Sequence, residues 1–294
     1  MNRCLICNSK TFLYKRINNI HINECPYCKL AFTVNPPNTT NLYNHNSTYS
    51  LKNYLIQKKD HQNKFEYISK QISRIIKRGN ILEVGAGFGL FTKILSNNKK
   101  YYIEIIEPNL LLHFIQKNSK IIKHKENYET FLKQNKKKFD AIILLDVLEH
   151  FKKPDIILKQ TNNIITEGGY IVLQFPNYTS IMAHICYNWS WWMLNDHKFH
   201  FSPSSAKLLL EKKGFNIVKI TTYEGVNDFK KNLDGNFTSI KNTLLRKVIK
   251  SIYFICFFPL YFMLRKLLWS LGYGGLILVI AQKKPTIYSE NKLV

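Results

Sequence analysis

The stretch from residue 80 to residue 89, Asn-Ile-Leu-Glu-Val-Gly-Ala-Gly-Phe-Gly, constrains the fold of this chain more than any other. The apolar residues Ile81, Leu82 and Val84 predict a short buried strand, and a helical pattern begins at Leu90, directly after three alternating glycines. Glycine allows the backbone to turn tightly and to approach a ligand that a Cβ atom would push away. A strand, a glycine turn and a helix in this order are typical of open α/β sheets, whose ligands lie beyond the carboxyl end of the first strand.

The spacing of the glycines narrows the choice of ligand. A dinucleotide fingerprint reads G-x-G-x-x-G, but here the third slot is Leu90, because the glycines stand at Gly85, Gly87 and Gly89. The run that begins at Glu83, Glu-Val-Gly-Ala-Gly-Phe-Gly, resembles the first motif of class I S-adenosylmethionine-dependent methyltransferases. From the residues alone, a tight strand–helix turn without a ligand remains the alternative.

Two further strands are predicted after the glycine turn. Residues 101–107 form the first of them, and its end at Glu107-Pro108-Asn109 is predicted to start a helix. An acidic residue about twenty positions past the turn is where a cofactor ribose is held, because a carboxylate accepts both hydroxyl protons. An ordinary carboxylate at a helix start is the alternative for Glu107. Residues 121–124 form the other strand, and the resemblance implies an adenine contact near Asn127, which opens the next helix.

Residues 139–145 are nearly all apolar, as expected of a strand that is covered on both faces. The strand runs into Asp146-Val147-Leu148-Glu149-His150, and the whole stretch resembles the fourth motif of the methyltransferase group that includes the ubiquinone-biosynthesis O-methyltransferases. The resemblance implies that Asp146 and Val147 lie near the methionine part of the cofactor, and that Glu149 and His150 face the acceptor. Histidine is suited to take a proton near neutral pH, although a solvent or helix-terminal histidine is the alternative.

An insertion at residues 176–202 interrupts the alternation of strands and helices, and it contains three tryptophans. Its last part, Asp-His-Lys-Phe-His-Phe-Ser-Pro from Asp196 onward, resembles a His-x-x-His-Phe-Ser segment that lines the acceptor pocket in the same relatives. His197 and His200 are therefore candidates for acceptor contact or acid–base work. A metal site would need a third ligand, and a purely structural role is the other alternative. Ser202 is expected to cap the helix that follows.

Four of the six cysteines form two pairs near the start of the chain. Cys4-x2-Cys7 is separated by 17 residues from Cys25-x2-Cys28, which matches the four-thiolate zinc pattern. Four thiolates leave zinc no open position, so the metal is expected to be structural and to supply folding energy to a module too small for its own core. A redox or unliganded site is the alternative.

The region 244–271 contains an apolar run, 251–264, that includes Pro259. Fourteen residues are fewer than the roughly 20 needed to cross a bilayer, and cations on both sides suit a segment in a membrane interface. Two helices that pack on the domain as a lid are the alternative. The net charge of +24 also suits anionic lipid or nucleic acid, but lysine enrichment by compositional bias explains it as well. The flanking cations are Arg246, Lys247, Lys250, Arg265 and Lys266.

Together these features predict an α/β fold: a Rossmann-like, doubly wound, seven-stranded mixed sheet whose last strand is antiparallel, with a small N-terminal zinc module and a helical lid insertion. The first residues lack the apolar run of a signal peptide, so we expect a cytoplasmic protein, peripheral on the inner face of the membrane if 244–271 binds lipid. The predicted parts are a zinc-ribbon-like module (1–35), a linker and helix (36–78, with the linker at Asn35-Pro36-Pro37-Asn38), the methyltransferase domain (79–283, with insertions 176–202 and 225–271) and a tail (284–294).

The resemblance covers Ile81 to Lys283 and implies methyl transfer from S-adenosylmethionine to a small molecule, such as a sugar, a phenolic or polyketide-like compound or a lipid-linked intermediate. An RNA methyltransferase that docks through the zinc module is the first alternative, although no Arg-rich stripe supports nucleic-acid binding. A non-catalytic membrane-surface protein is the second, and Leu90 argues against an NAD-dependent enzyme. The candidate cofactor-binding residues are Glu83, Gly85, Ala86, Gly87, Gly89, Glu107, Pro108, Asn127, Asp146 and Val147. The candidate catalytic residues are His150, His197 and His200, and the candidate zinc ligands are Cys4, Cys7, Cys25 and Cys28.

Overall fold

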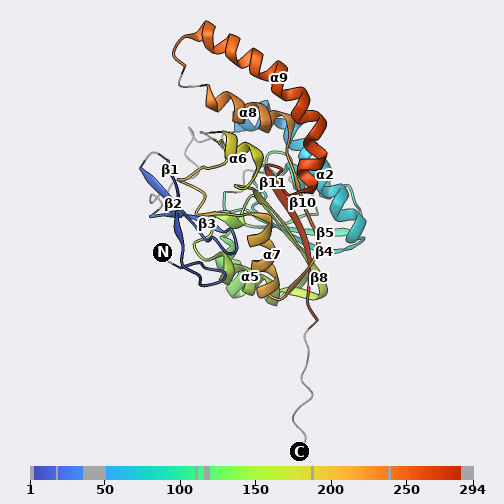
Figure 1. Cartoon of the computed structure of the whole chain (residues 1–294). Coiled ribbons are helices and arrows are strands. Elements are labelled where there is room, and N and C mark those ends of the chain that lie inside the picture. The colour runs from blue at the N-terminus through green and yellow to red at the C-terminus, as the bar shows by residue number, and fades with distance from the viewer. Residues whose placement is uncertain are drawn as a thin grey trace, which may run out of the picture.

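The computed structural model describes residues 3–17, 19–35, 51–109, 112–115, 120–186, 189–237 and 240–285 (Figure 1). In this part of the chain the central sheet has seven strands in the order β10-β11-β8-β7-β4-β5-β6. Strands β4 to β8 run parallel, whereas β11 lies antiparallel to both of its neighbours. The predicted mixed sheet, with its last strand antiparallel, is therefore confirmed. The strands are β4 (Gly79–Val84), β5 (Tyr101–Ile106), β6 (Ile122–His124), β7 (Phe139–Leu145), β8 (Ile165–Pro176), β10 (Phe215–Tyr223) and β11 (Leu276–Lys283).

Helices cover both faces of the central sheet, and each face has its own apolar core. Leu82 and Val84 of β4 face the core beneath α4, α5 and α7, whereas Ile81 faces the core beneath α2 and α3, as the period of two along a strand requires. Ser202 caps α7 by accepting a hydrogen bond from the backbone N–H of Ser205, as predicted. The helices are α1 (Leu51–Ile56), α2 (Lys58–Ile75), α3 (Leu90–Leu95), α4 (Tyr128–Gln134), η1 (Leu148–His150), α5 (Pro154–Asn163), α6 (Ile181–Ile185) and α7 (Pro203–Lys212).

One predicted helix differs from the structure. The described residues after Glu107 form turns at 108–109 and 113–114 instead of a helix, while 110–111 and 116–119 lie outside the described residues. Pro108 fixes its own φ, and Glu107 binds the N–H of Asn109 with its side chain, which favours a turn over the first turn of a helix. Residues 36–50, with most of the predicted linker, also lie outside the described part.

The cysteine-bearing segment forms a second, four-stranded sheet in the order β1-β2-β3-β9. Three of these strands come from the N-terminal segment, and β9 comes from the insertion before α7. The two parts are joined further by Ser202, whose hydroxyl donates to the carbonyl of Lys29 over 2.7 Å. The N-terminal module therefore packs directly against the main domain. The strands are β1 (Phe12–Ile17), β2 (Ile20–Glu24), β3 (Ala31–Val34) and β9 (Phe199–His200).

Two helices, α8 (Val226–Asn236) and α9 (Thr243–Ser270), lie between β10 and β11. Helix α9 continues through Pro259 as one element, so the helical segment is twice as long as the 14-residue apolar run in the sequence. Among the described residues it is the helix that is long and apolar enough to cross a membrane by length and composition, and only 6% of its most apolar window is buried. It runs along the outer side of α8, and its first turns extend beyond the rest of the molecule (Figure 1).

Candidate active site

The three glycines after β4 have positive φ angles of 75°, 53° and 79° at Gly85, Gly87 and Gly89. A Cβ atom on Gly85 would lie 2.6 Å from Val147, and one on Gly89 would lie 2.6 Å from Ile115, so both positions are closed to larger residues. A Cβ atom on Gly87 would meet no described atom within 4 Å. Gly87 therefore borders open space, where a ligand can approach the backbone.

Glu107 follows β5, and its carboxylate lies against the glycine turn. Val84 at the end of β4 pairs with Ile106 at the end of β5, so the turn and Glu107 are neighbours at one edge of the sheet. Oε2 of Glu107 accepts the N–H of Gly87 over 2.8 Å, and Oε1 accepts the N–H of Asn109 over 3.1 Å. Burial raises the pKa of this carboxyl group above its ordinary value.

Three other predicted cofactor contacts lie around this edge. Glu83 is buried within β4 and accepts a hydrogen bond from the hydroxyl of Thr92 over 2.6 Å, which ties the strand to α3. Burial raises the pKa of Glu83 to about 7. Ala86 is buried in the turn, and Asn127 is exposed immediately before α4, close behind the end of β6.

Asp146 lies at the carboxyl end of β7 with a φ of +56°, and it is held from two sides. Lys64 of α2 donates to Oδ2 over 3.0 Å, and the amide of Gln174 on β8 donates to both carboxylate oxygens over 2.8 and 2.9 Å. The phenol of Tyr223 in turn donates to Gln174. Asp146 therefore has a fixed orientation beside the glycine turn, and Val147 fills the space that a side chain at position 85 would need.

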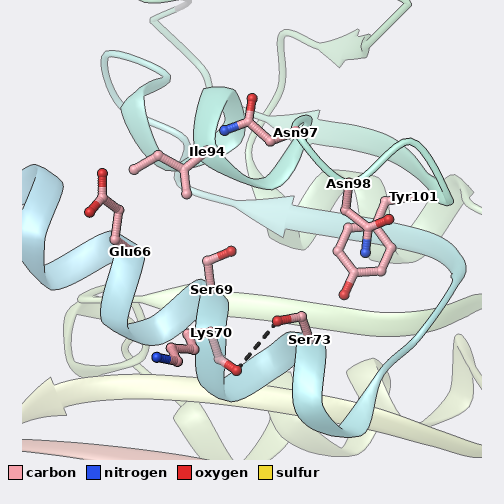
Figure 2. Close-up of a pocket in the computed structure, with 8 residues that line it drawn as sticks. All are labelled: Glu66, Ser69, Lys70, Ser73, Ile94, Asn97, Asn98 and Tyr101. Carbon is pink, nitrogen blue, oxygen red and sulfur yellow. Dashed lines mark hydrogen bonds between the residues drawn. The ribbon is translucent and has the colours of Figure 1, made fainter.

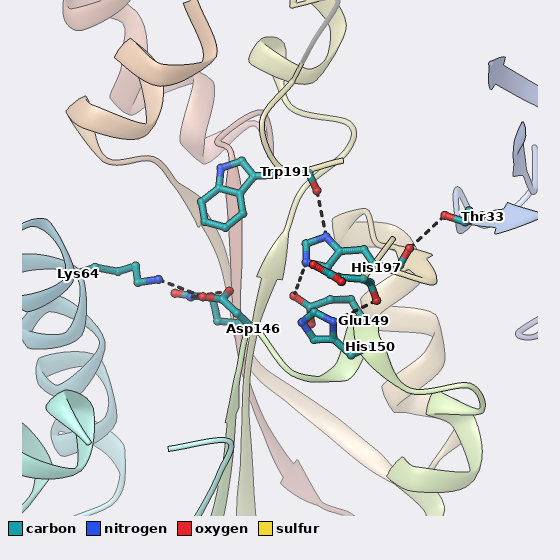
Figure 3. Close-up of polar contacts among 9 residues, drawn as sticks. Thr33, Lys64, Asp146, Glu149, His150, Trp191 and His197 are labelled. Carbon is teal, nitrogen blue, oxygen red and sulfur yellow. Dashed lines mark hydrogen bonds and ion pairs between the residues drawn. The ribbon is translucent and has the colours of Figure 1, made fainter. Parts of the chain in front are cut away.

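Glu149, His150 and His197 form a cluster on the side of Asp146 that faces away from Lys64 (Figure 3), with Glu149 and His197 buried and His150 half-buried. Glu149 is 1% exposed, and neither of its carboxylate oxygens has a hydrogen-bond partner in the described part of the chain. Its Oε1 lies 4.0 Å from Nε2 of His197. Nδ1 of His150 lies 3.1 Å from the carbonyl oxygen of Asp196, and Nδ1 of His197 lies 3.0 Å from that of Trp191.

The environment of this cluster favours uncharged side chains. Burial, and then the nearby Asp146, raises the pKa of Glu149 well above its usual 4.5. Burial lowers the pKa of His150, and burial together with the neighbouring histidines lowers the pKa of His197 well below 6.5. The three side chains can hold or exchange a proton, and because their ligand atoms lie within 4.8 Å of one another they could also hold a metal ion.

His200 lies outside this cluster. It belongs to β9, where its Nε2 lies 3.1 Å from the hydroxyl of Thr33 on β3, and burial lowers its pKa to about 3. Its ring also contacts that of Trp192, with centroids 5.0 Å apart. The structure therefore places the third candidate catalytic residue in the contact between the N-terminal module and the insertion.

The four cysteines of the N-terminal module converge. The sulfur atoms of Cys4 and Cys28 are 3.5 Å apart, those of Cys7 and Cys25 are 3.4 Å apart, and all four lie within 4.8 Å of one another. Zinc–sulfur bonds of about 2.3 Å in a tetrahedron place sulfur atoms about 3.8 Å apart. The cluster therefore fits a structural metal ion.

Comparison with known proteins agrees with this geometry. The family model described as a methyltransferase domain matches residues 57–220, more than half of the chain. This chain belongs to the methyltransferase domain family. It is 26% identical over 121 residues to a ubiquinone biosynthesis O-methyltransferase of Xylella fastidiosa (strain M23), which covers 40% of this chain and 48% of that protein. It is 31% identical over 130 residues to the mitochondrial ubiquinone biosynthesis O-methyltransferase of Dictyostelium discoideum, covering 39% and 40%.

The chain spans about half or less of the length of these two curated relatives. Among solved structures, a SAM-dependent methyltransferase from Archaeoglobus fulgidus is 21% identical, with a TM-score of 0.52, and the match covers 78% of this chain and 99% of that one. This likeness shows a shared fold.

A hollow on the surface of the methyltransferase domain lies between α2 and α3 (Figure 2). Tyr101, at its border, begins β5, so this hollow is at the amino end of the sheet, far from the glycine turn. Ligands of open α/β sheets bind at the carboxyl ends of the strands, so we assign no function to it. Its lining residues are Glu66, Ser69, Lys70, Ser73, Ile94, Asn97, Asn98 and Tyr101.

The partners of the acidic residues in the methyltransferase domain were not predicted from the sequence. Lys64 is 82 positions from Asp146, and Gln174 is 28 positions from it, so no local spacing connects them. Thr92 lies only nine positions from Glu83, across the glycine turn. A hydroxyl on the inward side of the helix after the turn is the signal that could have revealed this contact.

Proposed function

We propose that this methyltransferase domain binds S-adenosylmethionine at the glycine turn and transfers the methyl group to a small-molecule acceptor. The observation that carries the proposal is the juxtaposition of Glu107 and Gly87. The carboxylate of Glu107, which follows β5, accepts the N–H of Gly87 in the turn after β4 over 2.8 Å, directly beside the open space at Gly87. The family match over 57–220 supports the same conclusion.

The residues of the cofactor side fit this group. S-adenosylmethionine, when bound, supplies a methyl group on a positively charged sulfonium. Each oxygen of Glu107 accepts one backbone N–H and retains capacity for a ribose hydroxyl. The carboxylate of Asp146, whose side chain is 23% exposed, would bind the ammonium of the methionine part in exchange for the ammonium of Lys64 that it pairs with in this structure. Gly85 and Gly89 keep the turn tight, so that the backbone at Gly87 borders the adenosyl group.

The cluster of Glu149, His150 and His197 serves the acceptor in this proposal. Methyl transfer is an in-line displacement, so positioning of the acceptor supplies much of the rate. An acceptor hydroxyl must also lose its proton, and an uncharged imidazole can take it. The lowered pKa of His197 keeps that ring uncharged at neutral pH. The ring of Trp191 lies above the gap between Asp146 and the cluster, which suits an acceptor with an apolar part (Figure 3).

We further propose that the acceptor is a sugar, a phenolic or polyketide-like compound or a lipid-linked intermediate, because each carries such a hydroxyl. The N-terminal cysteines bind zinc in a structural role. The ion fixes the module that contacts the acceptor side through Thr33, whose hydroxyl donates to the carbonyl of His197 over 3.0 Å.

Calorimetric titration with S-adenosylmethionine tests the cofactor site. Glu107→Ala is expected to bind about 10- to 100-fold more weakly than the wild type, because a hydrogen bond to a charged group contributes about 1.5–3 kcal/mol. Glu126→Ala, which removes a half-exposed carboxylate from a nearby loop, is the control and should bind like the wild type. A wild type that does not bind, or a Glu107→Ala variant that binds fully while remaining folded, would refute the proposal.

Cell extract incubated with the enzyme and a cofactor that carries a labelled methyl group tests the acceptor side. We expect one or more small molecules to gain the label. His197→Gln should abolish labelling but bind the cofactor normally, because Gln preserves the volume and a hydrogen bond but is a far weaker base than imidazole. Label in RNA alone would favour the RNA methyltransferase alternative.

A further inference from the structure

Helix α9 packs on the molecule through one side only. Tyr261 is buried there, and its ring stacks on that of Phe229 in α8 with centroids 4.2 Å apart. Its hydroxyl donates to the buried carboxylate of Glu224 over 2.7 Å. Phe257 and Phe258, which lie four and three residues before Tyr261, also contact Phe229. These three side chains therefore define the inward side of α9. The helix is thereby attached to the domain near its middle.

The outward side of α9 is apolar as well. A helix on a protein surface normally directs polar residues toward the solvent. Here the outward positions, which are three to five residues apart, carry large aliphatic side chains over almost the full length of the helix. Their exposed fractions reach 70% at Ile255 and 72% at Met263. The outward side chains are Leu245, Val248, Ile252, Ile255, Leu260, Met263 and Leu267.

The charges around this apolar stripe have one sign. Residues 241–271 contain six Lys or Arg residues and no Asp or Glu. In the first turns of the helix, Arg246, Lys247 and Lys250 project from the side opposite Leu245 and Ile252, as their helical spacing requires. The N-terminal half of α9 is thus a basic amphipathic helix, and its apolar side continues into the exposed stripe of the C-terminal half.

We propose that α9 binds the surface of an anionic lipid membrane, lying in the interface with this stripe inserted between the head groups. A helix with an apolar side and a basic side has the form of such interfacial segments. A second copy of this chain is less suited to cover the apolar stripe, because two stripes that are both flanked by basic residues repel each other. Crossing is disfavoured because Tyr261 holds the middle of α9 to the domain and only five residues, 271–275, separate it from β11.

The membrane-binding helix is connected to the acceptor side. Glu224, which accepts from Tyr261, also accepts from the amide of Asn232 on α8 over 3.3 Å. Asn232 in turn accepts hydrogen bonds from the backbone N–H and the hydroxyl of Ser190, beside Trp191. This connection favours a lipid-linked acceptor, a step that rests on the proposed function, whereas membrane binding itself does not.

Co-sedimentation of the full-length protein with vesicles tests the proposal. The protein should bind vesicles of phosphatidylcholine with phosphatidylglycerol, and bind vesicles of phosphatidylcholine alone far more weakly. Replacing Arg246, Lys247 and Lys250 with Gln should weaken binding to the anionic vesicles about 100-fold. Replacing three exposed lysines elsewhere is the matched control and should weaken binding only slightly. The control positions are Lys77, Lys99 and Lys100.

The apolar stripe is tested separately. Ile252→Ser/Ile255→Ser should weaken binding about tenfold or more, because two buried apolar side chains are lost from the lipid contact. Ile56→Ser/Ile122→Ser replaces isoleucines of similar exposure, 74% and 53%, on α1 and β6 and should bind like the wild type. Circular dichroism checks that each variant is folded.

Cys256 provides a local probe, because it is exposed on α9 while the other five cysteines are buried or half-buried. Anionic vesicles should slow its reaction with a membrane-impermeant maleimide, and alkaline carbonate should release the protein, as expected of a helix that does not cross. The proposal is overturned if the wild type does not bind anionic vesicles, or if the variant of the three basic residues and the Ile252→Ser/Ile255→Ser variant both bind as well as the wild type. It is also overturned if the stripe mediates concentration-dependent self-association while vesicles leave Cys256 reactive.

Discussion

The three alternating glycines have different physical reasons for being glycine. Gly85 and Gly89 each approach a side chain, Val147 and Ile115, that a Cβ atom would strike at 2.6 Å. Gly87 has no such neighbour, and its N–H binds Glu107. Contacts within the protein therefore explain the glycines at positions 85 and 89, whereas the glycine at position 87 leaves space for a ligand to approach.

Comparing Gly87→Ala with Gly168→Ala distinguishes the cost of backbone strain from an effect on ligand binding. The positive φ of Gly87 should cost the variant about 1–2 kcal/mol of stability, measured by urea unfolding. The added methyl group should also weaken binding of S-adenosylmethionine at least about tenfold by calorimetry, since it occupies the open space. Gly168→Ala is the matched control: its φ is +72°, its Cβ would lie 3.7 Å from Gln282, and it is remote from the turn. Equal cofactor affinity in both variants would contradict this role of Gly87.

His200 makes the stability of the protein depend on pH. Burial lowers its pKa from 6.5 to about 3, so between these values the unfolded chain binds a proton that the folded chain does not. Stability is therefore fully present above pH 6.5 and falls as the pH falls toward 3. From about pH 7.5 to about pH 5.5, wild type should lose about 1.4 kcal/mol more stability than His200→Gln. Urea unfolding at both pH values measures this difference, and parallel losses would contradict it.

At the scale of elements, strands were predictable where their signal is local. The run at β7 is apolar because both faces are covered, and its bounds, Phe139–Leu145, are those predicted from the sequence. The pairing of β3 with β9 was not predictable, because it joins residues such as Thr33 and His200 that are 167 positions apart. An apolar helical segment was predicted within 244–271, but its continuity from Thr243 to Ser270 was not predictable, because Pro259 normally interrupts a helix.

The residues of the candidate site were likewise predictable only where their signal in the sequence is local. Motif resemblance pointed to Glu107 and Asp146 because each directly follows a strand, and strand ends meet at one edge of the sheet. The grouping of His197 with Glu149, apart from His200, depends on how the insertion folds over η1. No sequence pattern specified that arrangement, since the two histidines are only three residues apart and both are buried.

The pairing of β3 with β9 yields a prediction about the zinc module. Cys7→Ser should reduce bound zinc below one equivalent per chain and lower the melting temperature by about 5 °C or more, because the metal supplies folding energy to the module. Tryptophan fluorescence should also change, because Trp192 packs against Tyr14 of β1. Cofactor affinity should stay within about threefold, since the candidate cofactor residues lie outside the module.

The control for this prediction is Cys186→Ser, which alters a buried cysteine outside the cluster and should retain zinc. Zinc content is measured by atomic absorption of the purified protein. A wild type without zinc would remove the metal from the proposal. Loss of cofactor binding together with zinc would show that the module supports both halves of the site.

At the scale of the whole molecule, the two sides of the candidate site are built differently. The cofactor side is formed by consecutive strand ends between residues 84 and 147. The acceptor side combines η1 with the insertion before α7, and the insertion is held by three separate parts of the fold. Thr33 of the module binds the carbonyl of His197, Asn177 at the end of β8 donates to the carbonyls of Gly272 and Gly274, and Asn232 of α8 binds Ser190.

This construction predicts that the acceptor side can be loosened without loss of cofactor binding. Asn232→Ala removes the acceptor for the N–H and hydroxyl of Ser190 and should cost about 1–3 kcal/mol of stability, since the amide is buried. Tryptophan emission should shift to longer wavelength as the buried Trp189 and Trp192 gain contact with water. Asn162→Ala removes two comparable hydrogen bonds, to the carbonyls of Lys213 and Gly214, and should leave that emission unchanged.

Calorimetry with S-adenosylmethionine then distinguishes the two sides of the site. Both variants should bind the cofactor within about twofold of the wild type, because distant sites act independently when they share no partners. Transfer of the labelled methyl group to the acceptor should fall only in Asn232→Ala, because that variant loses the positioning of the acceptor by the insertion. If Asn232→Ala lost cofactor affinity instead, the insertion would have to close over the glycine turn as well, and α8 would control both binding steps.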